Sequence, residues 1–215
     1  MIETMDVKLK HPFSLLVSGS RGAGKSVFAR NLIKYRNDVF DKQFDRIVWL
    51  FAKHQEDLLE ELKSYFPTVE YVFGLPADLD EMFDKSKNNL LVLDDLMSQA
   101  SSDQRIEQLF TRGRHDNLSI IYLTQNLFHS KQRTISLNSD YIVVFKTPRD
   151  QSQFHHLAKQ FLPGNSKFLL WAFKDATKKP FSYIFLDARP QTNDKHRVRT
   201  NILPNEAPQY VYIPS

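Results

Sequence analysis

The residue run GSRGAGKS, at positions 19–26, has the residue types and the spacing of a phosphate-binding loop. Glycines let backbone N–H groups wrap around phosphates, and a helix that follows points the positive end of its dipole toward them. In this GxxxxGKS pattern (the P-loop, or Walker A motif), the lysine reaches the β and γ phosphates and the hydroxyl binds Mg²⁺. We therefore expect Lys25 to act in catalysis and Ser26 to bind Mg²⁺. The residues expected to contact the nucleotide, ATP, are Gly19, Ser20, Arg21, Gly22, Ala23, Gly24, Lys25, Ser26 and Val27.

The alternative for this loop is an ordinary turn before a helix. The flanking segments favour the P-loop, because the apolar run FSLLVS before it is typical of a strand and the run SVFARNLIKY after it is typical of a helix.

Two acidic residues, Asp94 and Asp95, follow the apolar run LLVL at 90–93. Open α/β sheets hold their ligands at the carboxyl ends of their strands. We expect Asp94 to hold Mg²⁺ through water, and Asp95 to orient or activate the attacking water. The alternative is that the acids only cap a following helix. Their distance from the P-loop leaves room for intervening strands, which favours the metal role.

A polar amide, Gln125, ends the apolar run LSIIYLT at 118–124. If this strand lies beside the acidic one, Gln125 would contact the attacking water or a phosphate oxygen and sense the γ-phosphate. A terminal glutamine could equally cap a turn. Just before this run, Arg112 and Arg114 flank a glycine. Either arginine could reach the nucleotide of a neighbouring subunit as an arginine finger, or the turn could be solvated or contact DNA.

Several other features favour ordinary structural roles. His155 and His156 have no matching cluster of acids or further histidines, so a core or surface role is favoured over metal binding. Four aromatic residues in apolar stretches are expected in the core rather than as stacking platforms: Trp49, Phe51, Trp171 and Phe173. Basic residues that are either solvated or follow a DNA backbone are Lys131, Arg133, Lys178, Lys179, Lys195, Arg197 and Arg199.

The elements that must position these residues alternate along the chain. Expected strands span 13–18, 46–51, 69–73, 90–93, 118–124, 141–146 and 182–186, and expected helices 25–35, 56–66, 78–85, 103–110, 150–161 and 167–174. Most of the strands are continuously apolar, as strands covered on both faces must be. The fold class is therefore α/β: a P-loop NTPase (RecA/ASCE-like) with a mostly parallel central sheet flanked by helices. Residues 1–189 would form the ATPase domain, and residues 190–215 an extended, basic, proline-containing arm with room for a final strand.

Composition, length and charge exclude several classes of protein. The 215 residues contain no cysteine, which excludes disulfide frameworks, zinc ribbons and thiol catalysis. The length suits one domain. No run approaches the roughly 20 apolar residues that span a bilayer, and the start of the chain lacks an apolar signal core, so we expect a soluble intracellular protein without a membrane partner. The net charge of +4 permits an anionic partner but does not demand one.

Six stretches resemble a known family. The loop GSRGAGKS, the run LLVLDD and the run FTRGRHDNLSIIYLTQNLFH are similar to the genome-packaging ATPases of the FtsK/HerA superfamily, in the poxvirus-type branch. The runs RTISLNSDYIVVFKTPRDQSQ, LAKQFLPGNSKFLLWAFKDATKKPFSYIFLDARPQT and RVRTNILPNE resemble the packaging ATPases of Polinton/Maverick elements and adintoviruses. The GKS loop is shared by many families, whereas RGRHDNLSIIYLTQN and RTISLNSDYIVVFKTPRD are far more specific.

The resemblance implies a homo-oligomeric ring, a pentamer or hexamer, that hydrolyses ATP at its subunit interfaces and drives double-stranded DNA into a capsid. It implies a capsid or vertex protein as a partner, and a location in the nucleus or viral factory of the infected host cell, or in the virion. Lys25, Ser26, Asp94, Asp95 and Gln125 fall on the family's phosphate, metal, acidic and sensor positions, and Arg112 or Arg114 on its arginine region. Asp95 departs from the glutamate of larger FtsK-type motors, which leaves the identity of the catalytic base open.

Three other functions share parts of this pattern. A replicative or recombination-type DNA helicase also combines a P-loop, an acidic strand, a polar sensor and an arginine finger. A slow ATP-dependent assembly switch would also fit an aspartate at position 95. A thymidylate-type kinase has the P-loop, but it predicts neither the strand-end glutamine nor a ring.

Overall fold

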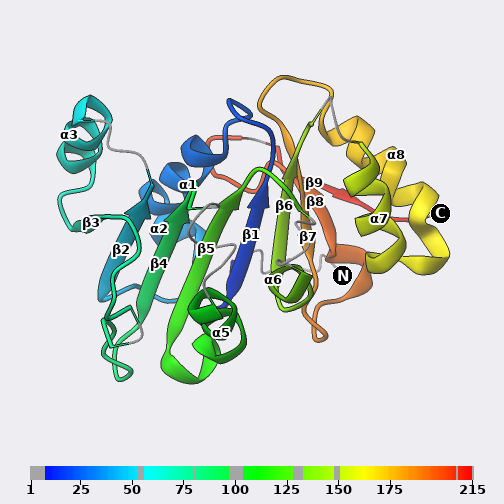
Figure 1. Ribbon diagram of the computed structural model, residues 1–215. Helices are drawn as coiled ribbons and strands as arrows, with labels where there is room; N and C mark the ends of the chain where they lie inside the picture. The colour runs from blue at the N-terminus through cyan, green and yellow to red at the C-terminus, as the bar shows by residue number, and fades with distance from the viewer. Residues whose placement is uncertain are drawn as a thin grey trace.

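A single sheet runs through the computed structural model, which describes residues 8–52, 56–79, 81–96, 104–127, 133–147, 151–206 and 208–214. In this described part, nine strands lie in the order β3-β2-β4-β5-β1-β6-β7-β8-β9 (Figure 1). The neighbours from β3 to β6 pair in parallel, and the pairs from β6 to β9 are antiparallel. The strands are β1 Ser14–Ser18, β2 Arg46–Phe51, β3 Val69–Phe73, β4 Asn89–Asp94, β5 Leu118–Thr124, β6 Tyr141–Phe145, β7 Tyr183–Asp187, β8 Val198–Thr200 and β9 Tyr210–Tyr212.

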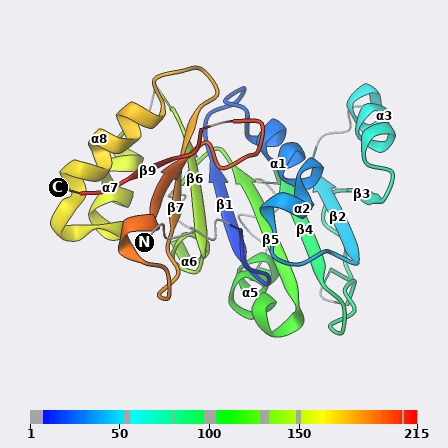
Figure 2. The same cartoon turned by 180° about the vertical axis from the view of Figure 1, so that it is seen from behind.

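Helices cover both faces of this sheet. They are α1 Lys25–Lys34, α2 Arg36–Val39, α3 Glu56–Tyr65, α5 Gln104–Arg112, α6 Arg133–Leu137, α7 Ser152–Phe161 and α8 Ser166–Ala176, with short 3₁₀ turns η1 Gly113–Asp116, η2 Pro163–Asn165 and η3 Asp194–His196. Figure 1 shows α5, α7 and α8 on one face, and Figure 2, from behind, shows α1 and α2 on the other. Within the described residues, no helix combines the length and apolar character needed to cross a membrane.

Alternation along the central strands explains the two covered faces. In β1, Leu16 packs in the core with α5, α7 and α8, while Leu15 and Val17 pack in the core with α1. All residues of β1, β5, β6 and β7 are buried. The expected α/β class with a mostly parallel sheet between helices is therefore confirmed, because only strands covered on both faces can be apolar throughout.

The expected elements match the observed ones closely, with one exception. The seven expected strands agree with β1 to β7 to within one residue at each end. Five of the six expected helices are also observed; the first residues of two of them, 103 and 150, lie outside the described part.

The helix expected at 78–85 is wrong, because the described residues there form turns and bends. Side chains take the hydrogen-bonding groups that a helix would use. The Arg46 guanidinium donates to the carbonyl of Met82, and the Asn89 amide donates to the carbonyl of Asp84 at 2.8 Å. The Asp84 carboxylate accepts from the backbone N–H two residues further on, at 2.9 Å. These side-chain bonds favour turns over helix.

The region expected as an extended arm with a final strand, residues 190–215, adds two strands to the sheet in its described part. β9 occupies the place expected for that strand, and β8 is an additional strand that the sequence did not indicate. The loop between them crosses over the sheet toward α1 (Figure 2). The Thr200 hydroxyl donates to the carbonyl of Tyr183 at 2.6 Å, which fixes the end of β8 beside β7.

The aromatic residues expected in the core divide into two groups. Trp49 is buried, and Phe51 and Phe173 are partly buried. The expectation is wrong for Trp171, whose side chain is 60% exposed. Trp171 lies on the outer face of α8 and packs edge-to-face on Tyr212, with ring centroids 6.0 Å apart. The added strand β9 gives this indole its neighbour at the surface.

Candidate functional site

The P-loop, residues 19–26, joins β1 to α1 at the carboxyl edge of the parallel strands. Two of its glycines meet a strict requirement. Gly24, directly before α1, has φ of +106°, in the left-handed region that favours glycine. A Cβ added at Gly19 would lie 2.7 Å from the Cβ of Phe145, too close for any side chain. In this conformation, the backbone of the loop and the N-terminus of α1 face the same side, where phosphates would bind.

Lys25 lies folded into this loop. Its ammonium donates to the carbonyl of Gly19 at 2.7 Å and to that of Ser20 at 3.0 Å. Burial lowers the pKa of Lys25, and the nearby charges of Asp94 and Asp95 oppose that shift. Because this cation has lost part of its hydration, a phosphate oxygen beside it would be bound more strongly than in bulk water.

Ser26 and Asp94 meet at the end of β4. The Ser26 hydroxyl donates to Oδ1 of Asp94 at 3.3 Å. Burial raises the pKa of Asp94, the Ser26 hydrogen bond lowers it, and the charge of Asp95 raises it again. A hydroxyl and a half-buried carboxylate side by side are the hard oxygen ligands that Mg²⁺ prefers. The pair therefore fits the metal role expected for these two residues.

Gln125 reaches Asp95 across the gap between neighbouring strands. β4 and β5 pair in parallel, with Asp94 opposite Leu123, so both chain turns leave the sheet at the same edge. The Gln125 amide nitrogen donates to Oδ1 of Asp95 at 2.9 Å. Asp95 has φ of +53°, a conformation that non-glycine residues adopt rarely and that gathers at functional sites. The structure thus places the expected water-orienting acid and the expected sensor in one hydrogen-bonded pair.

Arg112 and Arg114 lie at the opposite edge of the sheet from the P-loop of the same chain. In Figure 1 α5 and the turn that follows it lie at the lower end of the strands, and the loop after β1 lies at the upper end. The Arg114 guanidinium pairs with the carboxylate of Asp140, which is buried. Asp140 also accepts from the backbone N–H of Ser14, the first residue of β1. Within one chain, neither arginine joins the cluster around Lys25.

Replacing Arg114 with alanine is expected to lower the free energy of unfolding by about 1–2 kcal/mol. The change removes the cation beside the buried carboxylate of Asp140, whose remaining donors in the described part of the chain belong to Ser14. Arg112 is exposed and makes no side-chain hydrogen bond in the described part of the chain, so Arg112→Ala is the matched control and should leave stability nearly unchanged. Urea unfolding of the three proteins measures this. Equal stability of the Arg114 variant and the wild type would show that the pair contributes nothing.

The basic residues considered for DNA contact occupy different surroundings. Arg199 is 3% exposed and pairs with Asp187 at 3.6 Å, so it is not available to a DNA backbone. Arg197 donates to Asp194 at 2.6 Å, and Lys178 to Asp175 at 2.5 Å. Lys179 and Lys195 are exposed. Lys131 and the side chain of Arg133 lie outside the described residues. His155 and His156 are exposed, and no group of three or more possible metal ligands occurs in the described part.

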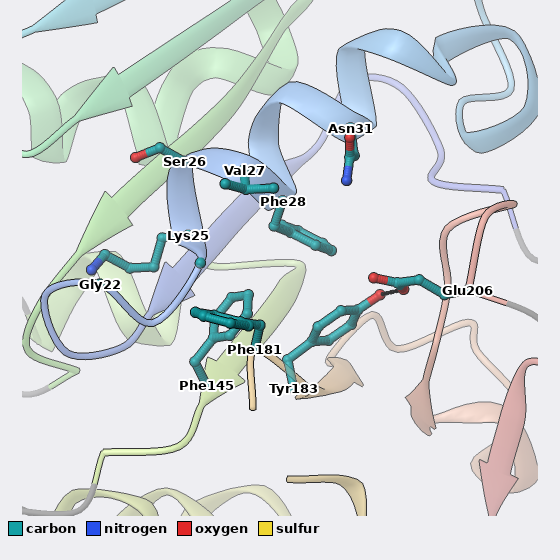
Figure 3. A pocket seen from close by; sticks show the side chains of 11 residues that line it. Gly22, Lys25, Ser26, Val27, Phe28, Asn31, Phe145, Phe181, Tyr183 and Glu206 are labelled. Atoms are coloured by element: carbon teal, nitrogen blue, oxygen red, sulfur yellow. Dashed lines mark hydrogen bonds between the residues drawn. The ribbon is translucent and has the colours of Figure 1, made fainter. Parts of the chain in front are cut away.

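A cavity of about 550 Å³ opens beside the P-loop and contains residues that sequence reasoning missed (Figure 3). Its lining comprises Gly22, Gly24, Lys25, Ser26, Val27, Phe28, Asn31, Phe145, Phe181, Tyr183 and Glu206. Phe181, Tyr183 and Glu206 are more than 150 positions from the P-loop. They lie in the runs that resemble the Polinton-type packaging ATPases, but nothing in the sequence marked them as residues of the nucleotide site. Only the pairing of β6 with β7, and the loop after β8, bring them to it.

Solved structures share this fold. The genome packaging NTPase B204 of Sulfolobus turreted icosahedral virus 2, solved with ATP-gammaS, has a TM-score of 0.53 at 14% identity, over 94% of this chain and 98% of that chain. The cytoplasmic domain of the Type VII secretion ATPase EccC of Thermomonospora curvata has a TM-score of 0.53 at 13% identity, over 86% of this chain and 26% of that chain. At these identities the likeness establishes the fold, that of the P-loop ATPases.

Curated relatives come from poxviruses. The chain is 27% identical over 135 residues to DNA packaging protein OPG160 of Vaccinia virus (strain Copenhagen), which covers 56% of this chain and 48% of the relative. OPG160 of Monkeypox virus matches with the same identity over 56% of this chain and 44% of the relative. The chain spans about half the length of the curated relatives it matches. A family described as Poxvirus A32 protein matches residues 4–152, which is more than half of the chain and includes the P-loop, both aspartates and Gln125. The expected resemblance to the poxvirus-type branch is confirmed, and the chain belongs to the Poxvirus A32 protein family.

Proposed function

We propose that this protein is a DNA-packaging ATPase that uses ATP hydrolysis to move double-stranded viral or virus-like DNA into a capsid, inside the infected cell. One observation carries the proposal: the gathering of Lys25, Ser26, Asp94, Asp95 and Gln125 at one edge of the sheet, in a member of this family. These residues come from three separate strand ends, and each has the chemistry that phosphoryl transfer needs.

The residues of this chain divide the work. The P-loop backbone and the Lys25 ammonium would bind the phosphates of ATP, and Ser26 with Asp94 would hold Mg²⁺, directly or through water. Bound Mg²⁺ would neutralise part of the charge on the β and γ phosphates. Asp95 would orient the attacking water and accept its proton. Gln125 donates a 2.9 Å hydrogen bond to Asp95. Loss of the γ-phosphate would therefore change the contacts of this pair before those of more distant residues.

The site would be completed by a second copy of the chain. Arg112 and Arg114 lie far from the P-loop of their own chain, so an arginine finger from either must act on a neighbouring subunit. Arg112 is the better candidate, because its guanidinium is exposed at the end of α5 whereas that of Arg114 pairs with Asp140. In a ring of five or six copies, the end of α5 in each subunit would lie against the nucleotide of the next subunit. DNA would pass through the centre of the ring, and a capsid or vertex protein would be the docking partner.

The test is ATP hydrolysis by the assembled protein with and without duplex DNA, at several salt concentrations. We expect duplex DNA to stimulate hydrolysis regardless of its sequence, and the stimulation to fall steeply with salt, since phosphate contacts release counterions. A protein without ATPase activity in either condition would contradict the proposal. A strand-displacement assay separates the helicase alternative, because a packaging motor should move along duplex without unwinding it. Very slow single-turnover hydrolysis would favour the assembly switch.

A further inference from the structure

The cavity beside the P-loop has walls of aromatic rings (Figure 3). Phe28 packs edge-to-face on Tyr183, with centroids 4.8 Å apart, and Phe145 lies 5.4 Å from Tyr183. Phe181 adds a ring that is 71% exposed although it lies against Gly24 of the P-loop. Phe28, Phe145 and Tyr183 are almost fully buried and form the floor of the cavity, so a flat, apolar ligand portion would stack on the exposed ring of Phe181.

The conformation of Phe181 is a second, independent observation. Its φ is +62°, in the left-handed region that is unfavourable for a bulky side chain. Such strain persists where the surrounding structure holds it, and ligand clamps are a common place for it. Here it holds a large apolar ring open to solvent beside the phosphate-binding loop, where a ligand bound to that loop would cover it.

The far end of the cavity is polar and fixed in orientation. The Tyr183 hydroxyl accepts from the backbone N–H of Ile202 at 3.0 Å and donates to Oε2 of Glu206. The same Oε2 accepts from the backbone N–H of Leu203 at 3.4 Å. Among the described residues, Oε1 of Glu206 takes part in no hydrogen bond. Figure 3 shows the carboxylate and the Asn31 amide on the side of the cavity away from Lys25.

We propose that this cavity binds the nucleobase of the nucleoside triphosphate and that Glu206 selects a purine with an amino group at position 6, which is adenine. The phosphates would lie on the P-loop, and the base would reach the rings of Phe28, Phe145 and Phe181. An ionised carboxylate only accepts hydrogen bonds. The 6-amino group of adenine donates one to it, whereas hypoxanthine and guanine present an acceptor oxygen at that position.

This inference rests on the proposed nucleotide site and deepens it. The test is equilibrium binding of ATPγS, inosine triphosphate and inorganic tripolyphosphate to the whole chain with Mg²⁺, by calorimetry. For the wild type we expect ATPγS to bind roughly tenfold more tightly than inosine triphosphate, the size of one hydrogen bond to a charged group. Glu206→Gln should bring that ratio toward one, because a side-chain amide can both donate and accept.

Two further variants separate base from phosphate binding. Phe181→Ala should weaken the binding of both nucleotides by a similar factor and leave the affinity for tripolyphosphate unchanged. Glu60→Gln, on an exposed position of α3 outside the cavity, is the matched control and should leave every affinity unchanged.

The outcomes distinguish selection of the base from binding of the phosphates. Equal binding of ATPγS and inosine triphosphate by the wild type, or a ratio that Glu206→Gln does not alter, would overturn the base-selection role while the phosphate site stands. Failure of the wild type to bind any of the three ligands, tripolyphosphate included, would overturn the nucleotide site itself, and with it the proposed function.

Discussion

Replacing Lys25 with alanine should lower ATP hydrolysis at least a hundredfold, about the effect of removing one preorganised electrostatic contact to a charged transition state. The Lys25 ammonium is held by the carbonyls of Gly19 and Ser20 at the position where phosphates would bind, and burial has already removed part of its hydration. The alanine variant keeps the backbone N–H groups of the loop but lacks the cation that would contact the phosphates. Nucleotide affinity should fall as well, since the lysine contacts ground-state phosphates.

Lys34→Ala is the matched control for this experiment. Lys34 is the last residue of the same helix, α1, and its side chain is exposed. Steady-state hydrolysis and equilibrium binding of ATPγS should be measured for the wild type and both variants. If the Lys25 variant hydrolysed ATP as fast as the Lys34 variant, the P-loop assignment would be wrong, whatever the rest of the geometry.

Residues close together in sequence made the centre of the site predictable. The P-loop is contiguous, and Asp94 and Gln125 each follow a continuously apolar run whose end could be recognised. Parallel strands end at a common edge, so the fold class alone predicted that these residues lie on the same edge. That β4 and β5 are neighbours depends on the strand order, which the sequence left open. The contact between Gln125 and Asp95 was not predictable, because it depends on the left-handed turn at Asp95.

Features that depend on long-range pairing could not be predicted. Nothing local to Arg114 marks Asp140 as its partner, since the carboxylate lies 26 positions away. Glu206 reaches the cavity because β7 and β8 extend the sheet antiparallel and the following loop turns back to Tyr183. The turns at 78–85 replaced an expected helix for the same reason: Arg46, from β2, binds a carbonyl there. Propensity and periodicity describe neighbours in sequence, and each of these contacts joins distant segments.

Asp94→Asn should have opposite effects on catalysis and on stability. In the presence of ATP and Mg²⁺ we expect hydrolysis to fall at least a hundredfold, because the amide is a poor ligand for the metal and cannot balance its charge. Without nucleotide and metal, we expect the variant to be more stable than the wild type. Burial raises the pKa of Asp94 above its usual 3.8, so the ionised carboxylate is disfavoured in the folded protein.

The pH dependence gives the sign of this stability effect. A carboxyl with a raised folded-state pKa contributes stability that is fully present below 3.8 and is lost as pH rises through the folded-state pKa. Asparagine does not titrate, so the advantage of the variant should be small near pH 4 and should grow as pH rises to about 7. Urea unfolding of both proteins across this range, without Mg²⁺, measures the difference. Glu60→Gln makes the same carboxyl-to-amide change at an exposed position of α3 and is the matched control. If the advantage stayed constant with pH, or if the variant were less stable at pH 7, the ionised carboxylate of Asp94 would not lower the free energy of unfolding.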